Sequence, residues 1–129
     1  MIAKEIKKIA KNRLKDAETL LRAKRYDGAV YICGYAIELC LKKQICKKLQ
    51  WTEFPPGHNF NDYKSLKTHN LEILLSFTGK ESKVKKQLFA EWSIVSQWDP
   101  ESRYNPIGNI KNKEAKQMIN SAKKILKEL

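Results

Sequence analysis

Arg103 is the residue of this sequence whose chemistry best suits a phosphate group. It lies in the segment Ser102-Arg103-Tyr104 and is the only basic residue between Lys86 and Lys111. A guanidinium binds phosphate through two parallel hydrogen bonds, because its planar fork matches the spacing of two phosphate oxygens. We therefore predict that Arg103 binds a phosphate and that Tyr104 stacks on the ligand or helps to position it.

Glu38 is an acidic residue in the most apolar stretch of the chain, residues 28–41. A carboxylate among apolar side chains needs a charged or hydrogen-bonding partner, because its burial is otherwise strongly unfavourable. Arg103 is a candidate partner. One interpretation is a buried ion pair that ties the last loop to the helix of Glu38. The other is that Glu38 orients Arg103 at a phosphate pocket.

The two histidines, His58 and His69, belong to no recognisable catalytic or metal-binding motif. Neither has the spacing to another histidine, cysteine or glutamate that zinc and di-iron sites use. The five glycines are dispersed, so the chain has no glycine-rich phosphate loop. We expect His58 to be an exposed loop residue and His69 to form local hydrogen bonds at a helix start. We expect no metal and no cofactor.

The net charge is the most unusual bulk property of these 129 residues, with 26 Lys and Arg against 14 Asp and Glu, or +12. The excess lies at the two ends of the chain, residues 1–25 and 111–129, whereas residues 49–110 are balanced. A field of this sign attracts polyanions such as nucleic acids, and Lys113 and Lys116 are expected to contribute to it. The alternative is a charge that serves solubility alone.

Apolar residues recur with the period of an α-helix, and no segment shows the sustained alternation of a half-buried strand. We predict helical caps at Asp27 and Thr68, a core position for Trp98, and a loop over residues 50–67. The pattern predicts a single all-α domain over residues 1–129, an antiparallel up-down bundle of four long helices plus one short helix. The expected helices span residues 2–23, 26–49, 69–78, 82–98 and 111–129.

The second expected helix is apolar on nearly every side, so it must be buried on more than one side. Its core stripe is accompanied by Tyr31, Tyr35 and Leu39 on the other sides. This helix is therefore either the centre of the domain or covered on one face by a second subunit. We expect a homodimer.

The cysteines and the apolar segments indicate a cytoplasmic protein. Cys33 and Cys40 lie about 10 Å apart along one expected helix, which is too far for a disulfide. Reduced thiols are typical of the cytosol. The apolar stretch of residues 28–41 falls short of the roughly 20 residues that a bilayer span needs, so we expect no contact with a membrane.

Two segments resemble signatures of the HEPN domain family (higher eukaryotes and prokaryotes nucleotide-binding). Residues 25–43, RYDGAVYICGYAIELCLKK, resemble the second helix of the family, with its Tyr-x-Gly-Ala start, a central Ala-x-Glu and a following Leu-Lys. Thr68-His69-Asn70-Leu71 resembles the Thr-His-Asp-Leu start of a later helix, with Asn70 in place of Asp.

A third segment adds to this resemblance. Ser102-Arg103-Tyr104 followed by Pro106 is similar to the Arg-Tyr-Pro segment before the final helix of the family, with Asn105 inserted. The three segments occur in the order that the family has, and the resemblance spans about residues 5–128.

The resemblance implies an antiparallel helical bundle that forms a homodimer with a basic cleft near its interface. Members bind nucleotides or RNA, many are encoded beside a small nucleotidyltransferase as toxin–antitoxin pairs, and some are metal-independent ribonucleases. The ribonucleases carry a histidine four to six residues after the arginine. Here no histidine follows Arg103 as far as Lys113, and Asn109 stands six residues on.

We therefore expect a cytoplasmic, homodimeric HEPN-like domain that binds a nucleotide or RNA without cleaving it. Its partner would be a nucleotidyltransferase, an antitoxin or another component of a defence system. Arg103 would bind phosphate beside Tyr104, and Lys113 and Lys116 would supply long-range attraction. One alternative is a ribonuclease toxin that uses Arg103 with a displaced histidine, His69. Another is a purely structural protein-interaction subunit.

Overall fold

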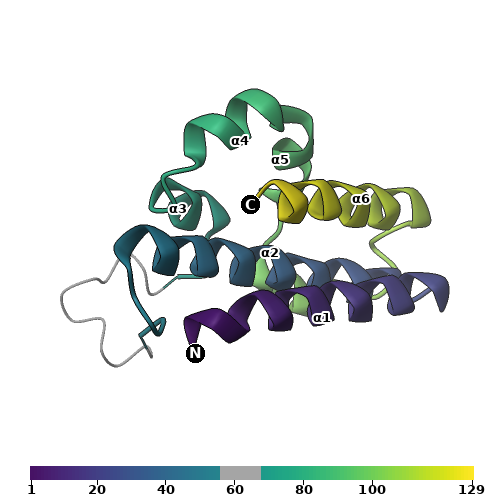
Figure 1. Cartoon of the computed structure of the whole chain (residues 1–129). Coiled ribbons are helices and arrows are strands. Elements are labelled where there is room, and N and C mark those ends of the chain that lie inside the picture. The colour runs from purple at the N-terminus through teal and green to yellow at the C-terminus, as the bar shows by residue number, and fades with distance from the viewer. Residues whose placement is uncertain (56–67) are drawn as a thin grey trace.

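The computed structural model describes residues 1–55 and 68–129, and only the backbone of Arg103 (Figure 1). The described chain is all-α, as the sequence predicts, apart from an isolated bridge between Ile2 and Glu53. Its helices are α1 (Ala3–Arg22), α2 (Tyr26–Leu49), α3 (Leu71–Ser76), α4 (Glu81–Gln87), α5 (Phe89–Val95), the 3₁₀ helix η3 (Pro100–Tyr104) and α6 (Asn112–Glu128).

The helix α2 is the centre of the fold, in contact with α1, α3, α6 and η3. Near its start, Asp27 accepts a hydrogen bond from the N–H of Ile110, just before α6. Near its end, Gln44 donates to the carbonyl of Leu129, just after α6. The helices α2 and α6 therefore run parallel, and α1 runs antiparallel to both (Figure 1). Because α2 buries residues on several sides, it has the central position that was one of the two arrangements predicted for it.

The other two long helices, α1 and α6, are amphipathic and bury one face each. Small and branched apolar residues recur there every three or four positions, which places them on one side of each helix. The buried apolar residues are Ile6, Ala10 and Ala17 in α1, and Ala115, Met118, Ile119, Ala122 and Ile125 in α6.

The predicted long helix over residues 82–98 is wrong, because the chain breaks it into α4 and α5. The break is at Leu88, whose backbone leaves helical geometry with φ −127° and ψ 35°. Val84, Leu88 and Trp92 are all buried and follow each other at helical spacing, so the apolar stripe continues through the bend and conceals it. The four long helices of the predicted bundle are therefore three long helices and a broken segment in the described chain.

The two predicted helix caps are also wrong. The helix α2 begins at Tyr26 without a side-chain cap, and Asp27 instead accepts hydrogen bonds from the backbone N–H groups of Gly108 and Ile110, at 2.7 and 3.0 Å. The cap of α3 is Asn70, whose Oδ1 accepts from the N–H of Ile73 at 3.1 Å. Asp27 thus serves a distant segment and the hydroxyl of Thr68 accepts from the N–H of Asn70 instead of capping α3, and local sequence does not distinguish these uses.

The cysteines and the apolar character of the helices bear on two further expectations. The cysteines Cys33, Cys40 and Cys46 are free, as expected, and all three are buried. Within the described residues, no helix combines the length and the apolar character that crossing a membrane requires. Residues 56–67, with His58, lie outside the described chain.

Candidate functional site

Glu38 is a buried carboxylate, 3% exposed, with two described partners. Its Oε2 is 3.0 Å from the Nζ of Lys42, one turn further along α2, and its Oε1 is 2.7 Å from the Nδ1 of His69. The side chain of Arg103, the partner suggested by the sequence, lies outside the described chain. The two ion-pair contacts explain how a carboxylate is tolerated in this apolar helix.

His69 connects the start of α3 to the middle of α2. Its side chain is 57% exposed, so one edge of the imidazole contacts Glu38 while much of the ring faces solvent. The expectation of local hydrogen bonds at a helix start is wrong for this residue, since its described partner lies 31 positions away in the sequence. When Nδ1 carries the hydrogen atom, it donates a hydrogen bond to Glu38, and Nε2 is then a hydrogen-bond acceptor.

A cavity of about 370 Å³ lies beside His69. The segment around His69 forms one side, and the chain that leads into η3 forms the other. The lining residues are Thr68, His69, Asn70, Leu71, Ser96, Trp98, Asp99, Pro100 and Glu101. The fold therefore brings His69 and the helix that contains Arg103 to one cavity, a proximity that spacing in the sequence does not reveal.

Trp98 fixes the position of η3 against α2. It is 8% exposed, as the predicted core position requires, and its indole occupies the space that a side chain at residue 34 would fill. A Cβ built on Gly34 would lie 2.0 Å from a ring carbon of Trp98. Tyr35 packs edge-to-face on the same indole, with ring centroids 4.9 Å apart, and on His69 at 6.1 Å. Gly34 is thus required by close packing and not by its backbone conformation.

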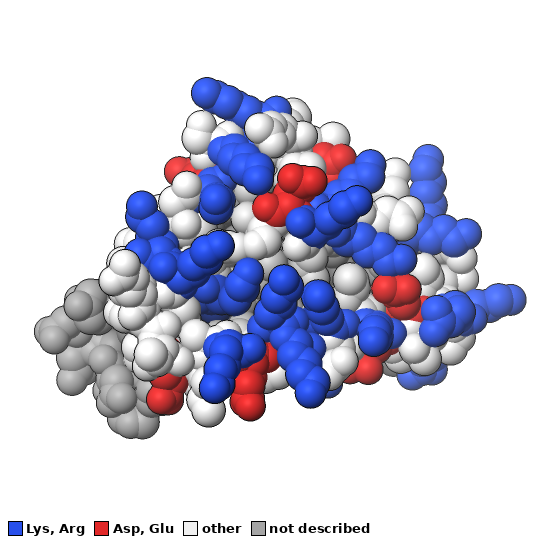
Figure 2. Space-filling model, in the orientation of Figure 1, with Lys and Arg blue, Asp and Glu red and all other residues white. Residues whose placement is uncertain are grey.

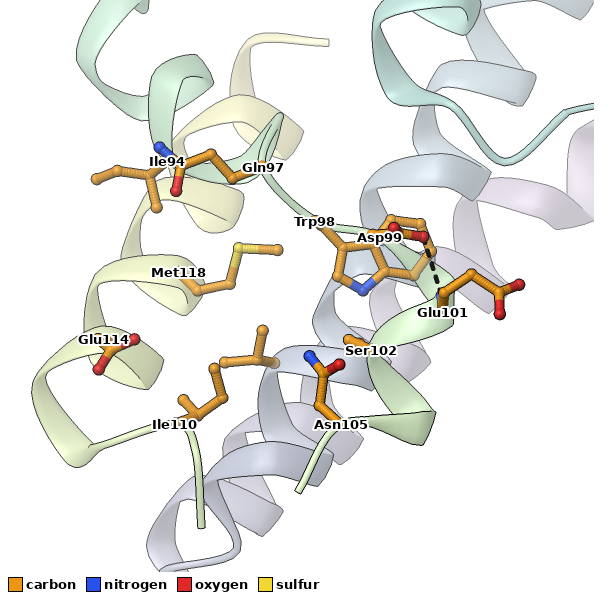
Figure 3. A pocket seen from close by; sticks show the side chains of 11 residues that line it. Ile94, Gln97, Trp98, Asp99, Glu101, Ser102, Asn105, Ile110, Glu114 and Met118 are labelled. Atoms are coloured by element: carbon orange, nitrogen blue, oxygen red, sulfur yellow. Dashed lines mark hydrogen bonds between the residues drawn. The ribbon is translucent and has the colours of Figure 1, made fainter. Parts of the chain in front are cut away.

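A second cavity, of about 290 Å³, lies between α2, the end of α5, η3 and the start of α6 (Figure 3). Trp98, Asp99 and Glu101 line both cavities, so the indole and the start of η3 stand between them. A third cavity, of about 220 Å³, shares Val30, Ser102, Asn105 and Ile110 with the second, and Asn109 lines it.

The excess of lysines gathers elsewhere, over α1, the end of α2 and α6 (Figure 2). Lys7 and Lys11 of α1 and Lys43 of α2 border a small hollow of about 20 Å³ with Ala10, Cys40, Leu126 and Leu129, and we call this surface the basic groove. Burial, together with the neighbouring charges of Lys7, Lys47 and Lys11, lowers the pKa of Lys43. These amines repel one another, so an anion bound there would relieve the repulsion.

The basic groove and Glu38 lie on opposite sides of α2. Cys40 lines the groove, and a side chain two residues earlier leaves the helix about 200° away from it. The basic excess seen in the sequence therefore does not surround the cavities of η3.

The other predicted binding residues are exposed, and Tyr104 lies in a different element from Lys113 and Lys116, which are neighbours on α6. Lys116 is on the side of α6 that also carries Lys123, which pairs with Glu18 of α1 at 3.3 Å. Lys113 is on the side of Lys124, which pairs with Glu91 of α5 at 3.5 Å. Neither Lys113 nor Lys116 lines a described cavity. Tyr104 is 72% exposed at the end of η3.

The described residues contain no set of side chains that could bind a metal ion. Among residues 1–55 and 68–129, no group of three or more histidine, cysteine, aspartate or glutamate side chains could hold a metal ion. The pair of Glu38 and His69 is occupied by its contacts with each other and with Lys42. What the described site offers is an oriented imidazole, an aromatic wall and hydrogen-bonding groups.

Comparison with known proteins adds a family to this geometry. A search of the curated proteins and a search of the solved structures found no match. The family model described as HEPN domain matches residues 3–129. That match spans nearly the whole chain, including α2, the segment of His69 and η3, which are the three segments that carry the resemblance in the sequence. The chain belongs to the HEPN domain family.

Proposed function

We propose that the protein binds RNA or a nucleotide without cleaving it. It acts as a homodimeric partner of a nucleotidyltransferase, or as a component of a toxin–antitoxin or defence system. The HEPN family is of nucleotide-binding and ribonuclease type, which supports the class of ligand. The single observation that carries the proposal is the basic groove, where Lys7, Lys11 and Lys43 converge from two helices.

The composition of the basic groove favours a polyanion over a small anion. No described residue that lines it is acidic, and its floor is formed by apolar side chains and a buried thiol. Lysines from two helices can neutralise several phosphates of one chain, and each neutralised phosphate releases a counterion, so the affinity falls steeply with salt. Solubility alone does not explain why Lys43 is partly buried, an arrangement in which burial, and then the charges of Lys7, Lys47 and Lys11, lower its pKa.

Arg103 and Tyr104 have a separate role in this proposal. Arg103 lies in η3 between the second cavity and the exposed Tyr104, and it binds a phosphate while Tyr104 stacks on the ligand. Lys113 and Lys116 attract the ligand from a distance, without direct contact at the cavities. An Arg103→Ala variant that bound mononucleotide and RNA like the wild type would contradict this assignment.

The homodimer is supported by the face of α2 that carries Tyr31, Tyr35 and Leu39. All three side chains remain partly exposed; Tyr35 and Leu39 pack against the core, and Tyr31 packs on Tyr35. A second subunit would cover them. Sedimentation at micromolar concentration tests this point, because a monomer there would contradict the dimer and leave RNA binding to be judged on its own.

Fluorescence anisotropy of a labelled single-stranded RNA tests the binding itself. We expect Lys11→Glu to weaken the affinity roughly tenfold at low salt, because it reverses a charge in the basic groove. Lys86→Glu is the matched control, an exposed lysine of α4 with the same change of charge. Equal losses for the two variants would show attraction by net charge alone. No binding by the wild type at low salt would leave the structural-subunit alternative.

A second candidate function, ribonuclease activity, is favoured by one observation. His69 is held by the buried Glu38 at 2.7 Å and lines the cavity that η3 borders. Nε2 could accept the proton of a ribose 2′-hydroxyl while Arg103 binds the phosphate, and the 2′-oxygen would then attack phosphorus. The leaving 5′-oxygen must also receive a proton, which one imidazole supplies only after it has become protonated in the first step.

Incubation of purified protein with RNA decides between the two functions. The proposed non-cleaving function predicts intact RNA over hours, and the same result for His69→Ala. Cleavage that is abolished both by His69→Ala and by Arg103→Ala would overturn it and establish the second candidate. Glu38→Gln sharpens the result, since loss of the carboxylate would reduce such cleavage by releasing His69 from its position.

A further inference from the structure

The second and third cavities share part of their lining, and we call the two together the η3 groove (Figure 3). Their volumes are about 290 and 220 Å³. Two adjoining hollows with apolar walls suit neighbouring side chains of one segment of another protein. The apolar lining residues are Val30, Ile94, Trp98, Ile110 and Met118 in the second cavity, and Val30, Tyr31, Pro106, Ile107 and Ile110 in the third.

One wall of the η3 groove is an exposed apolar loop that the fold holds in place. Ile107 in this loop is 99% exposed. The carboxylate of Asp27 accepts hydrogen bonds from the N–H groups of Gly108 and Ile110, at 2.7 and 3.0 Å. Lys111 donates to the carbonyl of Gly108 at 3.1 Å. An apolar side chain that an anchored loop holds in solvent suits a surface that another molecule covers, since a preorganised loop loses little entropy on binding.

The charge of the η3 groove selects the kind of partner. Its described lining contains no lysine or arginine, although the protein carries 26 of them. Figure 3 shows two of its carboxylates, Asp99 at the start of η3 and Glu114 in the first turn of α6, on opposite sides of the second cavity.

These two carboxylates are exposed, and neither forms an ion pair with a described residue. Ion pairs engage most of the other described carboxylates. A polyanion is therefore repelled by the η3 groove, whereas a segment that lies across it and carries cationic side chains is attracted from both sides.

We propose that the η3 groove binds a segment of a partner protein in which apolar side chains are flanked by lysine or arginine. The apolar side chains fill the two hollows, beside Met118 in one and Ile107 in the other. The flanking cations pair with Glu114 and Asp99.

This docking surface is separate from the basic groove. Val30 lines the former and Cys40 lines the latter, and the two residues are about 15 Å apart along α2. The inference therefore adds a surface for the protein partner to the proposed function, and it does not rest on RNA binding.

An array of synthetic peptides tests the inference with the full chain. Each peptide places leucine, isoleucine or tryptophan between two lysines, and the spacing between these residues is varied. In a second array glutamate replaces each lysine, and in a third array serine replaces each apolar residue. We expect the protein to bind members of the first array and not their counterparts in the other two. General attraction by the net charge of +12 predicts instead that the glutamate peptides bind best.

Variants of the groove then locate the binding, measured by fluorescence anisotropy with the lysine peptide that binds best. Glu114→Gln and Asp99→Asn should each weaken the affinity about two- to fivefold, the loss expected for an exposed ion pair. Asparagine keeps a side-chain oxygen that can accept the N–H of Glu101 and cap η3. Ile107→Ser should weaken the affinity about tenfold, because an apolar contact is lost. Glu128→Gln, at the other end of α6, is the matched control and should bind like the wild type.

Three results would overturn the inference. They are no binding of the lysine peptides, stronger binding of the glutamate peptides, and wild-type affinity in Glu114→Gln, Asp99→Asn and Ile107→Ser alike. A dimer that Ile107→Ser dissociates, together with no binding of the lysine peptides, would assign the groove to a second copy of the chain.

The failures of the two proposals remain distinguishable. RNA binding that depends on Lys11, without peptide binding, would leave the basic groove as the RNA site and reject the docking surface. Peptide binding that depends on Glu114, without RNA binding, would support the docking surface and reject the polyanion function of the basic groove.

Discussion

The two sides of α2 differ in how their charges are compensated. On one side, Lys7, Lys11 and Lys43 line the basic groove without an acidic side chain in the described lining, and Lys43 donates a hydrogen bond to the backbone oxygen of Leu129 at 3.4 Å. On the other side, Glu38, the one buried carboxylate among the described residues, has both Lys42 and His69 as partners. Uncompensated charge at a surface costs stability unless a ligand neutralises it, whereas a paired buried charge holds the fold in one arrangement. The first side is thus suited to binding and the second to positioning.

The fold separates two features that both suggest a polyanion in the sequence. The net charge of +12 and the Arg103 segment both suggest a polyanion, and it is natural to expect the charge around the arginine. The fold puts them on different sides of α2 instead. Variants of the lysines in the basic groove should therefore change RNA binding with little loss of stability, and variants of Glu38 should lower stability with little change in the salt dependence of RNA binding.

The largest expected effect is that of Glu38→Ala. Removing one member of a buried ion pair leaves the half-buried Lys42 without its partner, and we expect a loss of about 3 kcal/mol in the free energy of unfolding. Urea denaturation followed by circular dichroism measures it. The control is Glu81→Ala, which breaks an exposed pair with Lys85 and should cost about 0.5 kcal/mol or less. Similar losses of unfolding free energy in the two variants would contradict the expected difference between the buried and the exposed ion pair.

Next in size is Gly34→Ala. The added Cβ would overlap the indole of Trp98, so we expect a loss of about 1–3 kcal/mol from overpacking and a displaced η3. Gly28→Ala in the same helix is the matched control, since its Cβ would meet Leu20 at an ordinary 3.6 Å. There the higher helix propensity of alanine should make the change neutral or stabilising. A Gly34→Ala protein as stable as the wild type would show that Trp98 does not fix η3.

Parts of this arrangement could be predicted from the sequence. The all-helix pattern, the central position of α2 and the need of Glu38 for a partner all follow from local periodicity and the cost of burying charge. The identity of that partner does not, because His69 reaches Glu38 only through the fold of the intervening chain. The bend at Leu88 is concealed by an unbroken apolar stripe. The separation of the lysines from η3 depends on how α1 and α6 are rotated about α2.

The smallest expected effect at neutral pH concerns Cys40, the thiol at the floor of the basic groove. Burial raises its pKa to about 11, and it outweighs Lys43 and Lys7, which lower it. Cys40 should therefore react with a thiol reagent at pH 8 only as fast as the protein unfolds. Since the pKa is higher in the folded than in the unfolded protein, the thiol contributes stability below about pH 9 that is lost as the pH rises through 11.

Cys40→Ala should remove the loss of stability that ionisation of this thiol causes at alkaline pH. Thermal denaturation of the variant and the wild type at pH 8 and pH 11 measures the difference. Rapid labelling of folded wild-type protein at Cys40 would contradict the burial and would indicate that the lysines of the groove activate the thiol.

The salt dependence of RNA binding tests the central claim most directly. The observed association constant is measured between 50 and 200 mM salt for the wild type and for a triple variant that combines Lys7→Gln, Lys11→Gln and Lys43→Gln. For single strands, each phosphate contact contributes about 0.7 to the slope of log affinity against log salt, so the triple variant should lose about 2 from that slope. Glu38→Gln should leave the slope unchanged. A triple variant with the slope of the wild type would contradict the assignment of the basic groove as the RNA site.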